Sequence, residues 1–374
     1  MGLFGSSKKS YLGIDLGSGG IKVVELQNEK GRARLVTYGF NERTPDEQPT
    51  NPIDSPKETA ELLRKIVKAA RGTVLKAVGG LPIASVFSSV ISVPKGPDKE
   101  MKEAIQWQAK KLIPVPLEEM VLDSKIISGP KDKKSGDKPA GPAASKEGEK
   151  GDKKKEQKTV QVLITGAAKS MVQKYVAVFK TAGLELVSLE TETFALIRSL
   201  IGKDKTTSML VDIGSVRTNI VIVENGIPYV TRSLDMGGVE LTKAMAKALS
   251  LELSAAEKMK CDIKSVSSLY PGEGLPKIFE HTLAPMLTEL QYSMNLYAGQ
   301  DDENQGKRIE KVILTGGSAA LPALAGHVSE RLNVRAYVGD PWARVVYPDG
   351  LRPVLEEIGP RYAVAVGLAM RDIE

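Results

Sequence analysis

The chain has 374 residues, of which 41% are hydrophobic and 26% are charged. That composition is typical of a globular protein of roughly two to three domains, and it excludes a disordered or collagen-like chain. A single cysteine, Cys261, and two histidines, His281 and His327, exclude a disulfide framework and a histidine-rich zinc site. No stretch approaches the roughly 18 consecutive apolar residues of a membrane-spanning helix, so we expect a soluble, cytoplasmic protein.

The formal net charge is +6, and most of it lies in one segment. Residues 129–158 contain ten lysines and six acidic residues but no Val, Ile, Leu, Met or aromatic residue. Because such a segment cannot bury apolar area, we expect a disordered loop, inserted between strands at 121–128 and 159–165. The rest of the chain is nearly neutral, which disfavours a nucleic-acid-binding function.

Strand and helix patterns follow in chain order. Apolar runs within 11–26 predict two strands joined by a glycine turn, and the Pro- and Asn-rich residues 41–56 predict a loop. An amphipathic helix is predicted at 98–112, where we interpret Trp107 as a packing residue. Its buried side is expected to carry Met101, Ala104, Ile105, Ala109 and Leu112. Further strands are expected at 84–93, 121–128, 160–165 and 311–314, and further helices at 170–182, 239–250, 276–298 and from about Leu321.

The most informative feature is an internal repeat. Residues 11–26 and 209–223 share one pattern, in which an apolar strand is followed by an Asp, a Gly-Ser turn and a second β-rich run. The two copies of the turn, which begin at Asp15 and Asp212, lie 197 residues apart. Two homologous halves, each beginning with a β-hairpin, are therefore predicted.

The first hairpin turn carries groups suited to a phosphate. The turn consists of Gly17, Ser18, Gly19 and Gly20. Glycines at these positions let successive backbone N–H groups converge on an anion. Lys22 supplies a positive charge just beyond the turn, and Asp15 at the end of the strand can hold Mg²⁺ through its waters.

Two further elements would complete such a site. The second hairpin offers Asp212, Gly214, Ser215 and Thr218. Adjacent glycines after the strand at 311–314 would let a purine and ribose lie against bare backbone. That loop consists of Gly316, Gly317 and Ser318. A comparable surface is expected at Gly238 and on the helix that carries Glu240 and Lys243.

In this order the motifs resemble those of the actin-like ATPase superfamily, which includes chaperone ATPases and sugar kinases. The first turn matches the superfamily's first phosphate motif, the second motif falls at 212–218, and the adenosine motif falls at 314–318. The resemblance implies an α/β, two-lobed, duplicated ribonuclease H-like fold that binds ATP, with Mg²⁺ held by Asp15 and Asp212. It also implies a catalytic role for Asp212, and it aligns Glu190 with the glutamate that orients the attacking water.

Within the superfamily the chain resembles the PilM family of type IV pilus assembly proteins, over essentially its whole length apart from 129–158. The shared features are Leu3-Phe4-Gly5, the runs at 107–114 and 361–369, and Gly237-Gly238 followed by Ala256-Glu257 and Lys260. The resemblance implies a cytoplasmic scaffold, peripheral at the inner membrane through its partner alone. That partner is PilN, a membrane-anchored protein whose N-terminal cytoplasmic peptide would bind in a groove between the first core subdomain and the inserted one. Contacts with pilus motor ATPases and the platform protein, and self-association, are left open.

The resemblance also implies a domain order. The first core subdomain is expected at 1–80, together with 184–203 and a C-terminal helix at about 358–374. An inserted α/β subdomain, similar to that of the division protein FtsA, is expected at 81–183. A second lobe is expected at 204–357, with about 239–300 as its smaller subdomain.

Two other functions share these motifs. A sugar or metabolite kinase would need a carboxylate base in the first half, and residues 82–123 contain no motif for one. A membrane tether for the division ring, like FtsA, would need a C-terminal amphipathic helix, whereas this sequence ends in Arg371-Asp372-Ile373-Glu374. Because the second turn, 214–218, has few glycines, we expect ATP binding with at most slow hydrolysis.

Deletion of residues 129–158 tests the interpretation of that segment as a loop. We expect the melting temperature and the ATP affinity to stay nearly unchanged, because the segment contributes no apolar residue to a core. Differential scanning calorimetry and titration calorimetry measure the two quantities. A large loss of melting temperature would contradict the loop interpretation.

Overall fold

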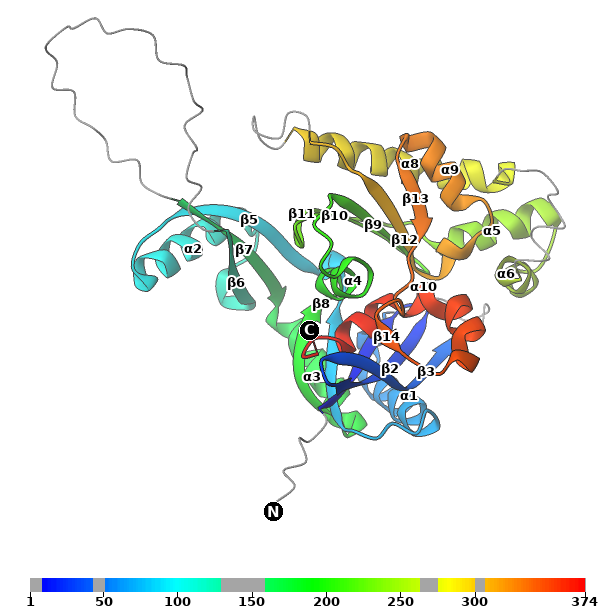
Figure 1. Cartoon of the computed structure of the whole chain (residues 1–374), viewed down its shortest axis with the longest axis horizontal. Helices are drawn as coiled ribbons and strands as arrows, with labels where there is room; N and C mark the ends of the chain where they lie inside the picture. The colour runs from blue at the N-terminus through cyan, green and yellow to red at the C-terminus, as the bar shows by residue number, and fades with distance from the viewer. Residues whose placement is uncertain (1–8, 43–50, 129–158, 263–274, 300–306, 374) are drawn as a thin grey trace, which may run out of the picture. The chain divides into compact units, whose positions relative to one another are not determined.

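The fold was analysed in a computed structural model that describes residues 9–42, 51–128, 159–262, 275–299 and 307–373 (Figure 1). The chain divides into two compact units. The core unit comprises Met1–Val86 and Lys169–Glu374, and the inserted unit comprises Phe87–Ala168. The predicted loop at 129–158 and the shared motif at 3–5 lie outside the described residues.

The core unit contains a six-stranded sheet with the order β14-β3-β2-β1-β4-β8. Strands β1, β2 and β3 form an antiparallel meander, while β4 and β8 run parallel to β1. The bounds of the strands are β1 Ser10–Gly17, β2 Gly20–Glu29, β3 Arg32–Glu42, β4 Lys76–Leu81, β8 Glu185–Thr191 and β14 Val345–Val346. The predicted first hairpin is confirmed, with Asp15 opposite Lys22 in its register.

A five-stranded sheet in the same unit repeats this arrangement, with the order β11-β10-β9-β12-β13. Its first three strands are again an antiparallel meander, and β12 and β13 again add in parallel. The bounds are β9 Ser208–Ile213, β10 Thr218–Glu224, β11 Ile227–Leu234, β12 Lys311–Thr315 and β13 Arg335–Val338. The predicted duplication of two hairpin-led halves is therefore confirmed.

The helices of the core unit have the bounds α1 Pro56–Ala69, α3 Lys169–Ala182, α4 Glu192–Leu196, α5 Gly238–Leu249, α6 Leu253–Cys261, α8 Lys277–Ala298, α9 Leu324–Leu332 and α10 Arg352–Ala369. The helices predicted at 170–182, 239–250 and 276–298 are confirmed within one residue, the C-terminal helix begins earlier than expected, and α1 and α6 were not predicted. The helix expected from about Leu321 begins later, because a 3₁₀ turn at Gly317–Ala320 comes first and Ala323 takes a left-handed conformation with φ of 61°. A π-helical turn, Ile197–Ile201, continues α4.

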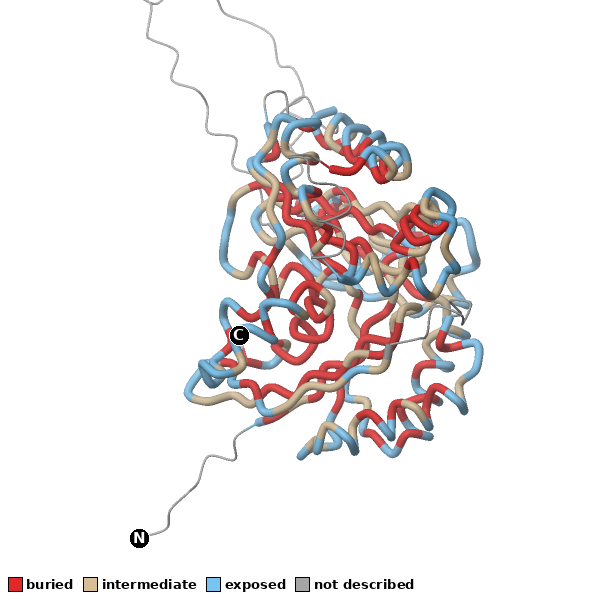
Figure 2. The backbone as a smooth tube through the Cα atoms, turned by 90° about the vertical axis from the view of Figure 1, so that its right-hand side faces the viewer, coloured by how far each residue is buried: buried red, intermediate tan, exposed pale blue. Residues whose placement is uncertain are grey.

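Helices α4 and α10 join the two sheets. One cluster of buried side chains contains Val78 from the first sheet and Leu210 and Ile313 from the second. Leu196 of α4 and Leu368 of α10 complete it, and the second half of α10 is buried along its length (Figure 2, red). The two halves of the core unit therefore share one apolar core around these helices.

Glycines let α10 lie directly on its neighbours. A Cβ at Gly13 of β1 would lie 2.0 Å from the carbonyl oxygen of Ala365, and a Cβ at Gly367 would lie 1.9 Å from the carbonyl oxygen of Ala195. No side chain fits at either contact. The helix α10 thus touches β1 on one side and α4 on another, backbone against backbone.

The inserted unit is a three-stranded sheet, ordered β5-β7-β6, with one helix packed on it. The bounds are β5 Val86–Pro94, α2 Asp98–Leu112, β6 Met120–Ser128 and β7 Thr159–Ala168. The unit is shorter than the subdomain expected at 81–183, because α3 packs on α1 and β8 of the core unit.

Helix α2 has the predicted bounds, but two of its residues differ from expectation. Met101, Ala104, Ile105 and Ala109 pack on the sheet, as expected. Leu112 is exposed, and Ile113 is buried at the end of the helix in its place. Trp107 is 58% exposed, so its interpretation as a packing residue is wrong; the Lys111 Nζ atom lies 3.3 Å from the centre of its ring.

Within the described part of the chain, no helix combines the length and the apolar character needed to cross a membrane.

A Gly13→Ala variant tests the contact between β1 and α10. We expect it to lower the free energy of unfolding by about 3 kcal/mol, because the added methyl overlaps the backbone of α10. Gly326→Ala is the matched control, since Gly326 lies in α9 with open space around it and alanine there should add about 0.5–1 kcal/mol. Urea denaturation measures both, and equal effects would contradict the packing argument.

Candidate functional site

The two hairpin turns meet in the core unit. A Cβ placed on Gly19, in the β1–β2 turn, would lie 2.9 Å from the Cβ atom of Ser215 in the β9–β10 turn. The second turn is closed by a hydrogen bond of 2.9 Å from the Gly214 N–H to the Arg217 carbonyl. Residues almost 200 positions apart in the sequence therefore face each other at the ends of their hairpins.

Three carboxyl groups gather beside these turns. Asp15 lies near the end of β1, Asp212 near the end of β9, and Glu192 is the first residue of α4. Burial raises the pKa of Asp15, and it raises the pKa of Asp212 to about 6, with the neighbouring charge of Asp15 adding to the effect. Burial, Asp15 and Asp212 together raise the pKa of Glu192 well above its usual range. The three groups are thus too close to carry full negative charge without compensation.

Lys22 supplies the nearby positive charge. Its Nζ atom donates a hydrogen bond of 3.1 Å to the Gly20 carbonyl and would lie 3.4 Å from a Cβ on Gly17. The ammonium group lowers the pKa of Asp15, Asp212 and Glu192, but burial and mutual repulsion outweigh it. Lys22 therefore compensates only part of the charge of the three carboxyl groups, and a further positive charge would stabilise their ionised forms.

Glu192 is a site residue that the sequence motif did not identify. Glu190, which was expected to orient the attacking water, lies within β8 rather than at the start of a helix. Its side chain is held by Arg198 and Arg371, at 2.9 and 2.8 Å. Because α4 begins two residues later, Glu192 and not Glu190 lies beside Asp15 and Asp212. The sequence did contain a signal for this residue, because Glu192 is the second glutamate within 189–195.

The third predicted loop lies against the second hairpin. A Cβ on Gly316, whose φ is 86°, would lie 2.6 Å from the Asp212 Oδ1 atom, so only glycine fits at this position. The amide N–H of Gly316 donates to the Pro360 carbonyl of α10 at 2.9 Å. Gly317 faces the side chain of Arg361, which also comes from α10.

The start of α5 closes the same surface. Its first residue, Gly238, donates its N–H to the Gly214 carbonyl at 2.9 Å, and Val239 donates to the Ser215 carbonyl at 2.9 Å. A Cβ on Gly238 would lie 2.7 Å from the Ser318 Oγ atom. The second hairpin, the adenosine-type loop and the start of α5 therefore form one continuous surface.

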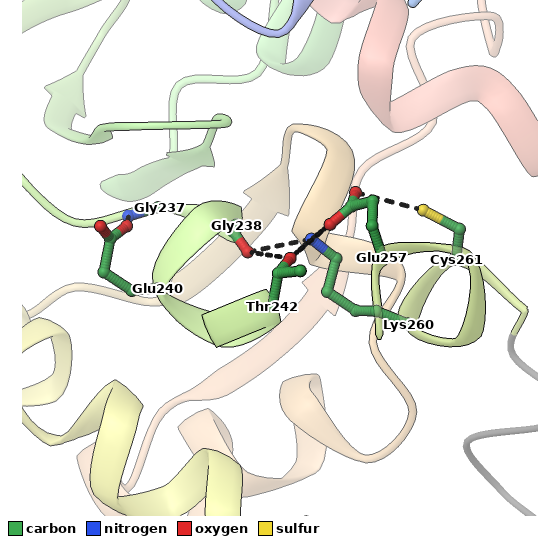
Figure 3. Close-up of polar contacts among 7 residues, drawn as sticks. All are labelled: Gly237, Gly238, Glu240, Thr242, Glu257, Lys260 and Cys261. Carbon is green, nitrogen blue, oxygen red and sulfur yellow. Dashed lines mark hydrogen bonds and ion pairs between the residues drawn. The ribbon is translucent and has the colours of Figure 1, made fainter. Parts of the chain in front are cut away.

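Glu240 and Lys243 contact the N-terminal turn of α5 and each other. The Glu240 carboxylate accepts the Gly237 N–H at 3.0 Å and so caps α5, as Figure 3 shows. Lys243 is exposed and lies 3.8 Å from Glu240. The hydroxyl of Thr218 is also committed elsewhere, because it donates to the Met236 carbonyl at 2.8 Å.

Two residues of α6 also contact the start of α5: Lys260 contacts Gly238, and Glu257 contacts Thr242. The Lys260 Nζ atom donates to the Gly238 carbonyl at 2.9 Å, to the Thr242 Oγ1 at 2.8 Å and to the Glu257 Oε2 at 2.6 Å (Figure 3). Burial acts to raise the pKa of Glu257, but the Lys260 charge and the hydrogen bonds outweigh it and lower the pKa. The side chain of Lys260 is only 9% exposed, so this contact is built into the fold.

A metal ion at this site would need ligands besides the protein. Among the described residues no three His, Cys, Asp or Glu side chains are grouped as a metal cage. Asp15 and Asp212 offer hard carboxylate oxygens, and Mg²⁺ usually keeps several waters and binds through one or two carboxylates plus substrate phosphates. The donor set therefore fits Mg²⁺ that arrives with a phosphate ligand.

Replacing Asp212 by Asn tests the crowding of the carboxyl groups. Because the folded-state pKa, about 6, is above the ordinary value of 3.8, this aspartate destabilises the ligand-free fold increasingly as the pH rises between those values. Asp212→Asn should therefore raise the melting temperature above pH 6 and leave it unchanged below about pH 4. Thermal denaturation at a series of pH values measures the effect.

Asp204→Asn is the matched control with the opposite sign. A hydrogen bond from Lys311 and further bonds from Thr206 lower the pKa of Asp204 to about 2. Its contribution to stability is present above its ordinary pKa and is lost as the pH falls towards 2. The variant should therefore melt lower at pH 7, and a shift in the same direction for both variants would contradict the crowding.

Comparison with known proteins identifies the family. A family model described as type IV pilus assembly protein PilM matches residues 13–147 and 149–373. The chain is 25% identical over 198 residues to the cell division protein FtsA of Bacillus subtilis (strain 168), a match that covers 48% of this chain and 44% of that protein. The chain thus spans about half the length of this curated relative.

Solved structures show the same fold. A PilM-PilN type IV pilus biogenesis complex matches with a TM-score of 0.75 and 27% identity over 97% of this chain and 98% of that one. The ethanolamine utilization protein EutJ from Carboxydothermus hydrogenoformans gives 0.51 with 16% identity over 96% and 89% of the two chains. MreB5 of Spiroplasma citri, bound to ADP, gives 0.50 with 11% identity over 97% and 96%. The fold is that of the actin-like ATPases, and the chain belongs to the PilM family of type IV pilus assembly proteins.

Proposed function

We propose that the chain binds ATP with Mg²⁺ where the two hairpin turns meet. The observation that carries the proposal is the contact between Gly19 and Ser215, with Asp15 and Asp212 on either side. Backbone N–H groups of two glycine-containing turns can surround a triphosphate, and Lys22 adds a positive charge. Mg²⁺ bound by Asp15, Asp212 and the phosphates would supply the charge that the three carboxyl groups lack.

The adenosine would lie on the surface formed by the adenosine-type loop and the start of α5. Gly316 and Gly317 expose backbone against which a purine can lie. Glu257, at the same end of α5, is an acceptor for ribose hydroxyls. The structure of MreB5, which shares the fold, holds ADP, and this supports the assignment.

Hydrolysis would be slow if it occurs. Glu192, rather than Glu190, is the carboxyl group placed to orient an attacking water beside Asp15 and Asp212. The second turn offers one glycine, Gly214, and its Arg217 side chain pairs with Asp235 at 2.8 Å.

Asp15→Ala tests the nucleotide site. We expect the affinity for ATP in the presence of Mg²⁺ to fall at least about ten-fold, because one of two metal-facing carboxylates is lost. Isothermal titration calorimetry measures the affinity, with Lys243→Ala as a control that should bind as the wild type does. Unchanged binding by Asp15→Ala would show that the nucleotide lies elsewhere.

We further propose that the chain is a nucleotide-regulated scaffold for type IV pilus assembly that binds the N-terminal cytoplasmic peptide of PilN and reaches the inner membrane through it. Membership of the PilM family and the 27% identity to a PilM-PilN complex over nearly the full length of both chains support this partner. The exposed Trp107 supports a peptide contact on the inserted unit, since exposed tryptophans are enriched at binding hot spots.

The peptide contact can be measured with the chain's own fluorescence. Trp342 is 1% exposed, so acrylamide quenches chiefly Trp107. We expect the PilN peptide, but not a scrambled one, to bind in anisotropy titrations and to protect Trp107 from quenching, and Trp107→Ala to weaken binding about ten-fold. Absence of peptide binding by the wild type would contradict the scaffold function.

A kinase function is tested separately. Rapid phosphoryl transfer from ATP to any member of a sugar panel would favour a kinase instead.

A further inference from the structure

We propose that Glu190 is a positioning residue: together with Arg198 and Arg371 it holds α4 against α10 and thereby fixes the place of Glu192. We call these three side chains and the Gly367 carbonyl the Glu190 clamp. The consequence for ATP affinity rests on the proposed function, whereas the effect on Glu192 does not.

The Glu190 clamp joins three elements of the core unit. The Glu190 carboxylate, in β8, accepts two hydrogen bonds from Arg198 Nη2, at 2.9 and 3.2 Å. Its Oε1 atom also forms an ion pair with the Arg371 Nε atom, just beyond the end of α10, at 2.8 Å. Arg198 lies in the π-helical turn after α4 and uses its other Nη atom to donate to the Gly367 carbonyl of α10.

The ion pair of Glu190 and Arg198 is partly shielded from water, so we expect it to contribute to the free energy of unfolding. The side chains of Glu190 and Arg198 are only 16% and 17% exposed, unlike a surface ion pair, which contributes little. Removing the carboxylate would leave two guanidinium groups close together without an anion between them. Both carboxylate oxygens of Glu190 thus contact an arginine, Oε1 from two sides and Oε2 from one.

Glu192 needs such support because its neighbours repel it. Burial first, and then the charges of Asp15 and Asp212, raise the pKa of Glu192, the first residue of α4. Ile83 donates its N–H to Glu192 Oε2 at 3.3 Å and is the contact that orients the carboxyl group. The clamp anchors the other end of the same short helix, six residues further on, where Gly367 lets α10 touch Ala195.

Glu190→Gln tests the clamp, because it keeps the shape of the side chain and removes its charge. The matched control is Glu224→Gln in the second sheet, where Glu224 is 15% exposed and pairs with Lys307 at 2.9 Å. Hydrogen exchange of the ligand-free protein should become about ten-fold faster at Ile83 and across α4 in Glu190→Gln, and stay unchanged there in Glu224→Gln. Glu190→Asp should restore most of the protection.

ATP affinity in the presence of Mg²⁺ provides the second measurement. Glu190→Gln should weaken it about ten-fold because the site is less preorganised, and the same change in a Glu192→Gln background should have little further effect. If Glu190 only stabilised the fold, Glu190→Gln would weaken ATP affinity by the same factor in the wild type and in the Glu192→Gln protein.

Each outcome decides the proposal. Unchanged exchange at Ile83 and α4 in Glu190→Gln, or equal effects of Glu190→Gln and Glu224→Gln, would overturn it. If the wild type binds no ATP while the exchange result is as expected, the proposed function fails and the clamp stands.

Discussion

The direct contact of α10 with β1 and α4 is the constraint on which the core unit depends. Gly13 and Gly367 bring three backbones together where no side chain fits. Because α10 also carries Leu368 into the core shared by both sheets, the two halves are held at one geometry. That geometry determines that Gly19 and Ser215, each at the tip of its own hairpin, come within contact distance.

The same packing sets up an electrostatic conflict. Asp15, Asp212 and Glu192 are carried by β1, β9 and α4, and among the described residues Lys22 offsets part of their charge. Groups that destabilise the empty protein are typical of binding sites, where a ligand of complementary charge relieves the repulsion. The ionised Asp212 therefore lowers the stability of the fold, while Asp204 raises it.

Much of the fold was predictable from the sequence, because the repeated Asp-Gly-Ser turn and the apolar periodicity are local signals. The duplicated hairpins and the bounds of α2 were confirmed, and the loops that meet at the site were correctly grouped. Glu190 does not lie at the start of the connecting helix, because β8 continues through it and α4 begins only at Glu192. The helix cap made by Glu240 was likewise not predicted, because it depends on the contact of its carboxylate with the Gly237 N–H. Such choices depend on register and on tertiary partners, which a motif does not contain.

Lys260 has one more consequence. An ammonium group has three hydrogens, and here each of them is taken by an oxygen of the protein, those of Gly238, Thr242 and Glu257. All three N–H donors of Lys260 are therefore used within the protein, and the side chain links α5 to α6. Because Glu257 neutralises the charge of Lys260, the pair joins the two helices without giving this edge a net charge.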